Sequence, residues 1–360
     1  MKKPICLAFL SLLLLSRPAT ALTINVTYDA SVTNFPNASQ VEAAFATAVQ
    51  VFQDLYTNKA TINITMYLGP AGPFAGDTIS LGESQFELVG SSYSEITNAL
   101  FTHRVSAADI SSVASLPAVD PIGNNINWLV PLAEARALNL SGLPPDQDGG
   151  VSFATNVTYT FDPNNRSVAG KFDFIGVAEH EISEVLGRCT FGLQSEYVPY
   201  DLFRFTNAAA RNFDPSATNV YFSVNNGVTA LKFFYTNAAF GDVQDWLSTA
   251  TPDSFDAFAS SGHILPLSIA DIAVLDVLGY NGPGLAPPRL FVTNSAAGTI
   301  RIRFVNSPGR SFTVLESTNL TTPLASWTVL GTPAESPAGQ FQFTDTTATN
   351  QQRFYDVRSP

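Results

Sequence analysis

The stretch that decides the fold reads FIGVAEHEISEVLGR and covers residues 174–188. Apolar residues recur in it at the spacing of one helix face: Ile175, Ala178, Ile182 and Val185. His180 and Glu184 are four residues apart, so a helix places their side chains one above the other on the opposite face. Gly187 follows where a chain reversal at a helix end favours glycine. The pattern predicts a helix over Phe172–Leu186 with an imidazole and a carboxylate on adjacent turns.

These two side chains are suited to binding a divalent metal ion. Imidazole and carboxylate groups on adjacent turns can both bind one cation, and Glu181 projects beside them, where it could act as a base toward water. The spacing is nearly the H-E-x-x-H-x-x-G pattern of zinc peptidases, with Glu184 in place of the second histidine. The spacing also allows an ion pair between Glu184 and Arg188 on a solvated helix face. Both interpretations stay open at this point.

Other reactive side chains have two interpretations each. Cys189 either joins the ligands or is a small buried hydrophobe. Tyr197 and Tyr200 either donate hydrogen bonds to an oxyanion or pack in the interior. His103 and His263 have no partner at ligand spacing, which favours structural or exposed positions.

The rest of residues 22–281 mixes helical and strand periodicities, which predicts an α+β domain. The predicted elements are helices Val41–Tyr56 (with Ser39 as N-cap) and Ser268–Leu278, strands Ala60–Leu68 and Val151–Phe161, and a hairpin in Tyr221–Tyr235 around Asn225-Asn226-Gly227.

A second domain is predicted after a Gly/Pro-rich linker at residues 282–288. The charge balance changes there. Residues 22–288 contain 26 acidic and 9 basic residues, whereas residues 289–360 contain 4 acidic and 6 basic residues. Short alternating runs then follow at roughly ten-residue spacing. They predict a small all-β sandwich over residues 289–360.

The beginning of the chain has the pattern of an export signal. Lys2 and Lys3 precede an apolar run, and Ala19-Thr20-Ala21 follows as a cleavage site, so residues 1–21 are predicted to be a signal peptide. This predicts a secreted protein, extracellular or periplasmic. No other apolar run approaches 18 residues, so no membrane anchor is expected.

Charge and cysteine content exclude further classes. Without residues 1–21 the chain has 15 basic and 30 acidic residues, a net charge of −15. Nucleic acid is therefore not an expected partner, because phosphate neutralisation needs clustered Lys and Arg. Cys189 is then the one remaining cysteine, so no internal disulfide is expected.

Four blocks, taken in order, resemble a group of secreted bacterial zincin-like proteins of the metzincin type. They are GVAEHEISEVLGR (residues 176–188), YDLFRF (200–205), DSFDAF (253–258) and LSIADIAVLDVLGY (267–280). The resemblance covers most of residues 40–281 and implies a zincin-like metallopeptidase domain. It implies that His180 and Glu184 bind a divalent metal, that zinc is this metal, that Glu181 is the general base and that Asp201 is a third ligand.

Two functions follow from this resemblance. The first is a peptidase that hydrolyses protein or peptide substrates through metal-activated water. The second is a catalytically inactive zincin scaffold that acts in extracellular adhesion or binding. In it, the C-terminal sandwich would contact a cell surface or polysaccharide. Glu184 and Thr190 stand where metzincins have histidines, and the last methionine, Met66, precedes any methionine turn, which favours the second function. The retention of Glu181 beside His180 favours the first.

Overall fold

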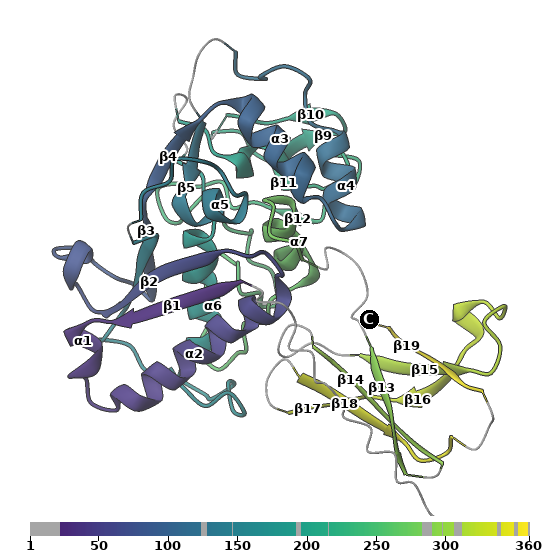
Figure 1. Ribbon diagram of the computed structural model, residues 1–360. Coiled ribbons are helices and arrows are strands. Elements are labelled where there is room, and N and C mark those ends of the chain that lie inside the picture. The colour runs from purple at the N-terminus through teal and green to yellow at the C-terminus, as the bar shows by residue number, and fades with distance from the viewer. Residues whose placement is uncertain are drawn as a thin grey trace, which may run out of the picture.

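The structure of the protein is a computed structural model. It describes residues 22–123, 128–145, 147–191, 196–214, 216–282, 290–296, 298–305, 312–336, 340–348 and 352–358. The predicted signal peptide (1–21), residues 283–288 of the predicted linker and residue 289 lie outside the described residues. Helices and several sheets are mixed along the described chain, which confirms the α+β class (Figure 1).

The main sheet has the order β1-β2-β6-β3. Its strands are β1 (Thr23–Tyr28), β2 (Thr61–Leu68), β6 (Gly149–Phe153) and β3 (Gly82–Phe86). The first three are parallel, and β3 joins β6 in antiparallel register at the edge of the sheet. Every second residue of β2 is buried, as the predicted alternation requires.

Two helices pack against each other and against this sheet. They are α2 (Ala38–Leu55), which runs alongside β1 and β2 in Figure 1, and α6 (Phe174–Val185). Phe153 of β6 joins them, because its ring lies 5.9 Å from that of Phe45 and 4.8 Å from that of Phe174. This aromatic packing attaches α6 to the sheet, and α6 also contacts the edge strand β3.

The remaining elements of the larger unit surround this core. The other helices are α1 (Ala30–Thr33), α3 (Tyr93–His103), α4 (Ala107–Ala114), α5 (Leu132–Ala137) and α7 (Ile269–Val277), with 3-10 turns η1 (Gly72–Phe74) and η2 (Pro199–Phe203). A second sheet consists of β10 (Ala210–Arg211), β9 (Arg204–Asn207), β11 (Tyr221–Phe222) and β12 (Lys232–Phe233). Two further pairs are β4 (Leu88–Ser91) with β5 (Trp128–Pro131), and β7 (Tyr159–Thr160) with β8 (Phe172–Asp173).

Most predicted elements are present, with three corrections. The predicted helix Phe172–Leu186 begins only at Phe174, because Phe172 and Asp173 form β8. The predicted strand Val151–Phe161 is two strands, because the chain bends after β6 and β7 then pairs with β8 in a different sheet. Helix α2 begins earlier than predicted. Its N-cap is Asn37 in a left-handed conformation (φ 67°), and Ser39 lies inside the helix. The hairpin is confirmed as antiparallel pairing of β11 with β12.

The C-terminal unit has two sheets. One has the order β13-β14-β18-β17 and the other β16-β15-β19. The strands are β13 (Phe291–Ala296), β14 (Thr299–Val305), β15 (Thr313–Ser317), β16 (Thr328–Gly331), β17 (Ala334–Glu335), β18 (Gln340–Asp345) and β19 (Phe354–Arg358), and η3 (Leu324–Ser326) precedes β16. Both sheets contribute to one hydrophobic cluster that is separate from the cluster of residues 22–280.

No helix in the described part of the chain is both long enough and apolar enough to span a bilayer.

Candidate metal centre

Helix α6 is buried on its polar face as well as its apolar face. Within it only His180 is partly exposed, with 15% of its side chain accessible. The helix ends at Val185, and Gly187 follows shortly after it with a φ of 124° that suits glycine and a missing side chain that leaves room for Glu134. The expectation of a solvated polar face is therefore wrong, because other segments of the chain cover that face.

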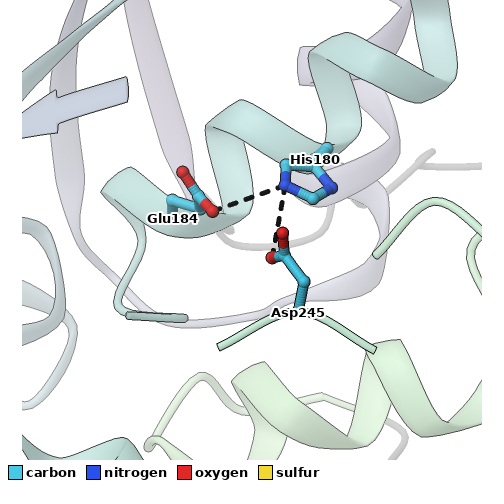
Figure 2. Close-up of side chains that lie close together, drawn as sticks. All are labelled: His180, Glu184 and Asp245. Carbon is cyan, nitrogen blue, oxygen red and sulfur yellow. Dashed lines mark ion pairs between the residues drawn. The ribbon is translucent and has the colours of Figure 1, made fainter. Parts of the chain in front are cut away.

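Three side chains converge on one point next to this helix (Figure 2). His180 Nε2 lies 3.4 Å from Glu184 Oε1 and 3.4 Å from Asp245 Oδ1. One ligand atom from each of the three residues lies within 4.8 Å of the others, which makes the group able to hold a metal ion. The group thus contains the two predicted ligands and one residue that the sequence analysis did not select.

The two distances from His180 Nε2 fit donors around a tetrahedral ion. Two donors bound at about 2.1 Å to a tetrahedral ion lie about 3.4 Å apart. Both measured distances from Nε2 match that separation. One imidazole nitrogen and two carboxylate oxygens form a harder donor set than several histidines, and this set is compatible with zinc and with other divalent ions.

The imidazole of His180 is held by a backbone carbonyl. Its Nδ1 lies 2.8 Å from the carbonyl oxygen of Ser254, so a proton on Nδ1 leaves the Nε2 lone pair directed at Glu184 and Asp245. Ser254 is itself fixed by its hydroxyl, which donates to the carbonyl of Gly176. The block at residues 253–258 therefore orients the first ligand.

Both oxygens of Glu184 accept hydrogen bonds. Ser84 of β3 donates to Oε2 at 2.7 Å, and Gln244 donates to Oε1 at 3.1 Å. Ser84 comes from the edge strand and Gln244 from the segment that carries Asp245. The carboxylate is thus oriented from two sides before any ion binds.

Arg188 joins the two carboxylates below the site. Its fully buried guanidinium donates to Asp245 Oδ1 at 2.5 Å and to Glu184 Oε1 at 3.2 Å, and it lies 4.4 Å above the ring of Phe255. The alternative of a Glu184–Arg188 ion pair is therefore correct in its partners. The pair is buried, however, and it belongs to the same cluster as His180.

The charges of this cluster shift the pKa values of its members. Burial disfavours the ionised form of Glu184, but the hydrogen bond from His180 and the charge of Arg188 lower its pKa to about 2. Burial lowers the pKa of His180, whereas the charge of Asp245 raises it, and the resulting pKa is about 10. A divalent cation must therefore compete with a proton on His180, so its binding is pH-dependent.

Glu181 lies beside this group without a hydrogen-bond partner among the described residues. Its side chain is only 5% exposed and lines the same cleft. A Cβ atom on Gly82 of β3 would lie 2.3 Å from Glu181 Oε1, so the glycine makes room for this carboxylate. Burial and the negative charge of Glu184 raise the pKa of Glu181.

The group opens into a cleft of about 960 Å³. Its walls are formed by β3 and the segment before it, by α6, and by residues 240–245 and 254–259. The carboxylates that line it are Asp77, Glu83, Glu181, Glu184, Asp242, Asp245 and Asp256. Within the described residues β3 is the edge strand of its sheet, and Gly82, Glu83 and Ser84 of this strand line the cleft.

Asp201 lies outside the group formed by His180, Glu184 and Asp245. Its carboxylate accepts hydrogen bonds from the Thr190 hydroxyl at 2.8 Å and from the Val198 backbone N–H at 3.1 Å. It therefore stabilises the start of η2. In this structure Asp245 occupies the place that the resemblance gives to Asp201.

Asp245 had no sequence signal of its own. It lies 61 residues after Glu184, in a segment without periodicity. Its position depends on backbone contacts: its carbonyl accepts from the N–H of Tyr235, and the indole of Trp246 donates to Asp271 of α7 at 2.6 Å. A sequence feature that could have drawn attention to Asp245 is its neighbour Trp246, because a buried tryptophan fixes the backbone beside it.

The other candidate side chains are packed in the interior. Cys189 is 2% exposed and is not among the residues that could hold the ion. Tyr200 is fully buried against Phe222 and Phe234, and Tyr197 packs against Trp128. The packing interpretation is thus the one that the structure favours for both tyrosines.

Comparison of the chain with protein-family models, with curated proteins and with solved structures found no match.

Proposed function

We propose that this protein is a secreted, metal-dependent peptidase of the zincin-like type. The observation that carries the proposal is the position of Glu181. It is a buried carboxylate without a hydrogen-bond partner among the described residues, and it lies in a cleft beside the possible ligands His180, Glu184 and Asp245. A carboxylate that no protein group occupies beside a possible metal centre is available to act as a base toward a water molecule there.

The edge strand β3 supports a peptide as the substrate. Extended peptides bind to sheet edges by adding a strand, with main-chain hydrogen bonds providing affinity. The cleft brings this edge next to the metal centre, because Gly82 contacts Glu181 and Ser84 donates to Glu184. A peptide paired with β3 would have its main chain near both residues.

Each residue then has a defined role. His180, Glu184 and Asp245 hold a divalent ion, which when bound supplies Lewis-acid activation of water and polarises the peptide carbonyl. Glu181 takes a proton from the attacking water and returns it to the leaving amine. Arg188 holds both ligand carboxylates in position.

Export and attachment belong to the same proposal. The N-terminal pattern and the resemblance of the four blocks support secretion of a bacterial zincin-like protein. The C-terminal two-sheet unit would serve as an attachment module toward a cell surface or polysaccharide. No contribution to hydrolysis is assigned to it.

A second candidate function is an inactive zincin scaffold used for extracellular adhesion or binding. Arg188 favours it, because the guanidinium already compensates both carboxylates and the group is stable as an ion-pair network with protonated His180. The two candidates differ in whether a metal ion binds in place of the proton.

The test compares two carboxylate variants from the same helix. Glu181→Gln should keep the metal and the melting temperature but lose casein hydrolysis by about 10²- to 10⁴-fold, because it removes a base and not a ligand. Glu184→Ala should lose the metal first, together with the metal-linked part of the stability.

Metal content, melting temperature and casein hydrolysis are measured for the wild type and both variants. Wild-type protein that binds metal but cleaves nothing would support the scaffold. Wild-type protein that binds no divalent metal at all would exclude the peptidase.

A further inference from the structure

The cleft carries carboxylates that neither the metal centre nor the fold uses. Asp77, Glu83 and Asp242 line it next to the metal group, and Asp77 and Asp242 are exposed. In the described part of the chain, none of the three has an ion pair with a Lys, Arg or His side chain. These three carboxylates are therefore available to form ion pairs with a positively charged group of a ligand.

Glu83 is close enough to Asp77 and Asp242 for their charges to act on it. Burial raises the pKa of Glu83, and the negative charges of Asp77 and Asp242 raise it further. Like charges gathered without compensation are unfavourable in the free protein, so a cation between them lowers the free energy of the complex.

A second metal ion does not account for them. Among the described residues, His180, Glu184 and Asp245 are the one group of three or more His, Cys, Asp or Glu side chains with ligand atoms close enough for an ion. The carboxylates of Asp77, Glu83 and Asp242 are not grouped with ligand atoms close enough for one metal ion, so a side-chain ammonium or guanidinium is the cation considered for them.

Other walls of the cleft favour such a side chain. The described lining residues include no Lys or Arg. Phe240 and Phe258 line the cleft and are 74% and 49% exposed, so their rings are available to the stem or the charged end of a Lys or Arg. Glu181, buried and unpartnered in the same cleft, independently marks it as a place where a ligand is met.

We propose that the cleft selects peptides that have an arginine or lysine side chain next to the scissile bond. Asp77, Glu83 and Asp242 hold this charged side chain. The inference rests on the proposed peptidase function and names its substrate class. Glu83 lies on β3 itself, so a peptide paired with this strand would have its own side chains close to Glu83.

The test uses two internally quenched peptides of identical sequence that contain either arginine or citrulline. Citrulline has the same shape as arginine but no charge. Wild-type protein should cleave the arginine peptide with a kcat/KM at least about 10-fold higher at low salt, and 0.5 M NaCl should reduce this ratio because charge attraction is screened. The Glu83→Gln/Asp242→Asn double variant should bring the ratio close to one.

The control for charge is Asp54→Asn, which changes an exposed carboxylate on α2 and should leave the ratio unchanged. A binding measurement separates the inference from catalysis. Fluorescence anisotropy with Glu181→Gln protein and labelled forms of both peptides should show at least about 10-fold tighter binding of the arginine peptide.

The outcomes distinguish the two proposals. Equal cleavage of both peptides by active wild-type protein would overturn the inference and leave the peptidase intact. Preferential binding of the arginine peptide without any cleavage would support the inference and contradict the peptidase. Equal binding of both peptides by the Glu181→Gln protein would overturn the inference whether or not cleavage occurs.

Discussion

Helix α6 takes part in two buried clusters, each with one arginine and two carboxylates. At its start, Arg166 donates to Asp173 at 2.7 Å and lies 3.6 Å from Glu179. At its end, Arg188 pairs with Glu184 and Asp245. The two clusters thus share the same pairing of one arginine with two acidic residues, and these residues are buried in both. A buried arginine with two acids is therefore not evidence of function by itself.

The two clusters differ in the other groups that they contact. Arg166 and Asp173 bind the carbonyl and the N–H of Leu265, so they attach the helix to a neighbouring segment. The cluster at Arg188 includes an oriented imidazole and opens into a cleft that holds the unpartnered Glu181. An accessible ligand atom and a cavity distinguish a candidate metal centre from a structural ion pair.

The largest expected effect separates the two arginines. Arg188→Met and Arg166→Met should each destabilise the metal-free protein by about 3–5 kcal/mol, because each leaves buried carboxylates uncompensated. Among the described residues, the two carboxylates beside Arg188 are joined by His180 as a third possible ligand, so a divalent ion can replace the lost charge there. Added zinc should therefore raise the melting temperature of Arg188→Met more than that of the wild type.

Arg166→Met serves as the matched control and should show the wild-type shift with zinc. Thermal unfolding with and without zinc, in a chelated buffer, gives all the values. An identical zinc-induced shift in both variants would remove the distinction between the clusters.

A smaller effect is expected from the hydrogen bond that orients Glu184. Ser84→Ala removes the donor to Oε2 and should weaken metal binding by about 10-fold with little loss of stability, as is typical of groups that orient a ligand. Ser167→Ala is the matched control, because its hydroxyl donates to the carbonyl of Gly262 at an exposed site. Isothermal titration with zinc compares the two, and equal affinities would mean that Ser84 does not orient the ligand.

The same comparison explains what the sequence could predict. His180, Glu181 and Glu184 lie in one helical turn, so their juxtaposition follows from periodicity alone. Asp245 could not be found in that way, since its position depends on packing of Trp246 between segments far apart in the chain. The choice of Asp201 came from the resemblance, whereas local hydrogen bonds to Thr190 and Val198 determine where that carboxylate lies.

The fold was predictable to a similar extent. Helices and strands with strong periodicity, such as α2, β2 and α7, are close to their predicted bounds. The break after β6 could not be predicted from the sequence, because the strand-like pattern continues from β6 into β7 although the partner strand changes. Strand pairing is a long-range property that a local pattern does not contain.

The central claim is that His180, Glu184 and Asp245 form the metal centre, and the most direct test is metal stoichiometry. Wild type, Asp245→Asn and Asp201→Asn are dialysed against zinc and analysed by mass spectrometry, with circular dichroism as a check of folding. We expect about one ion per chain in the wild type and in Asp201→Asn, and a loss of most of it in Asp245→Asn. Full metal content in Asp245→Asn together with loss in folded Asp201→Asn would contradict this account.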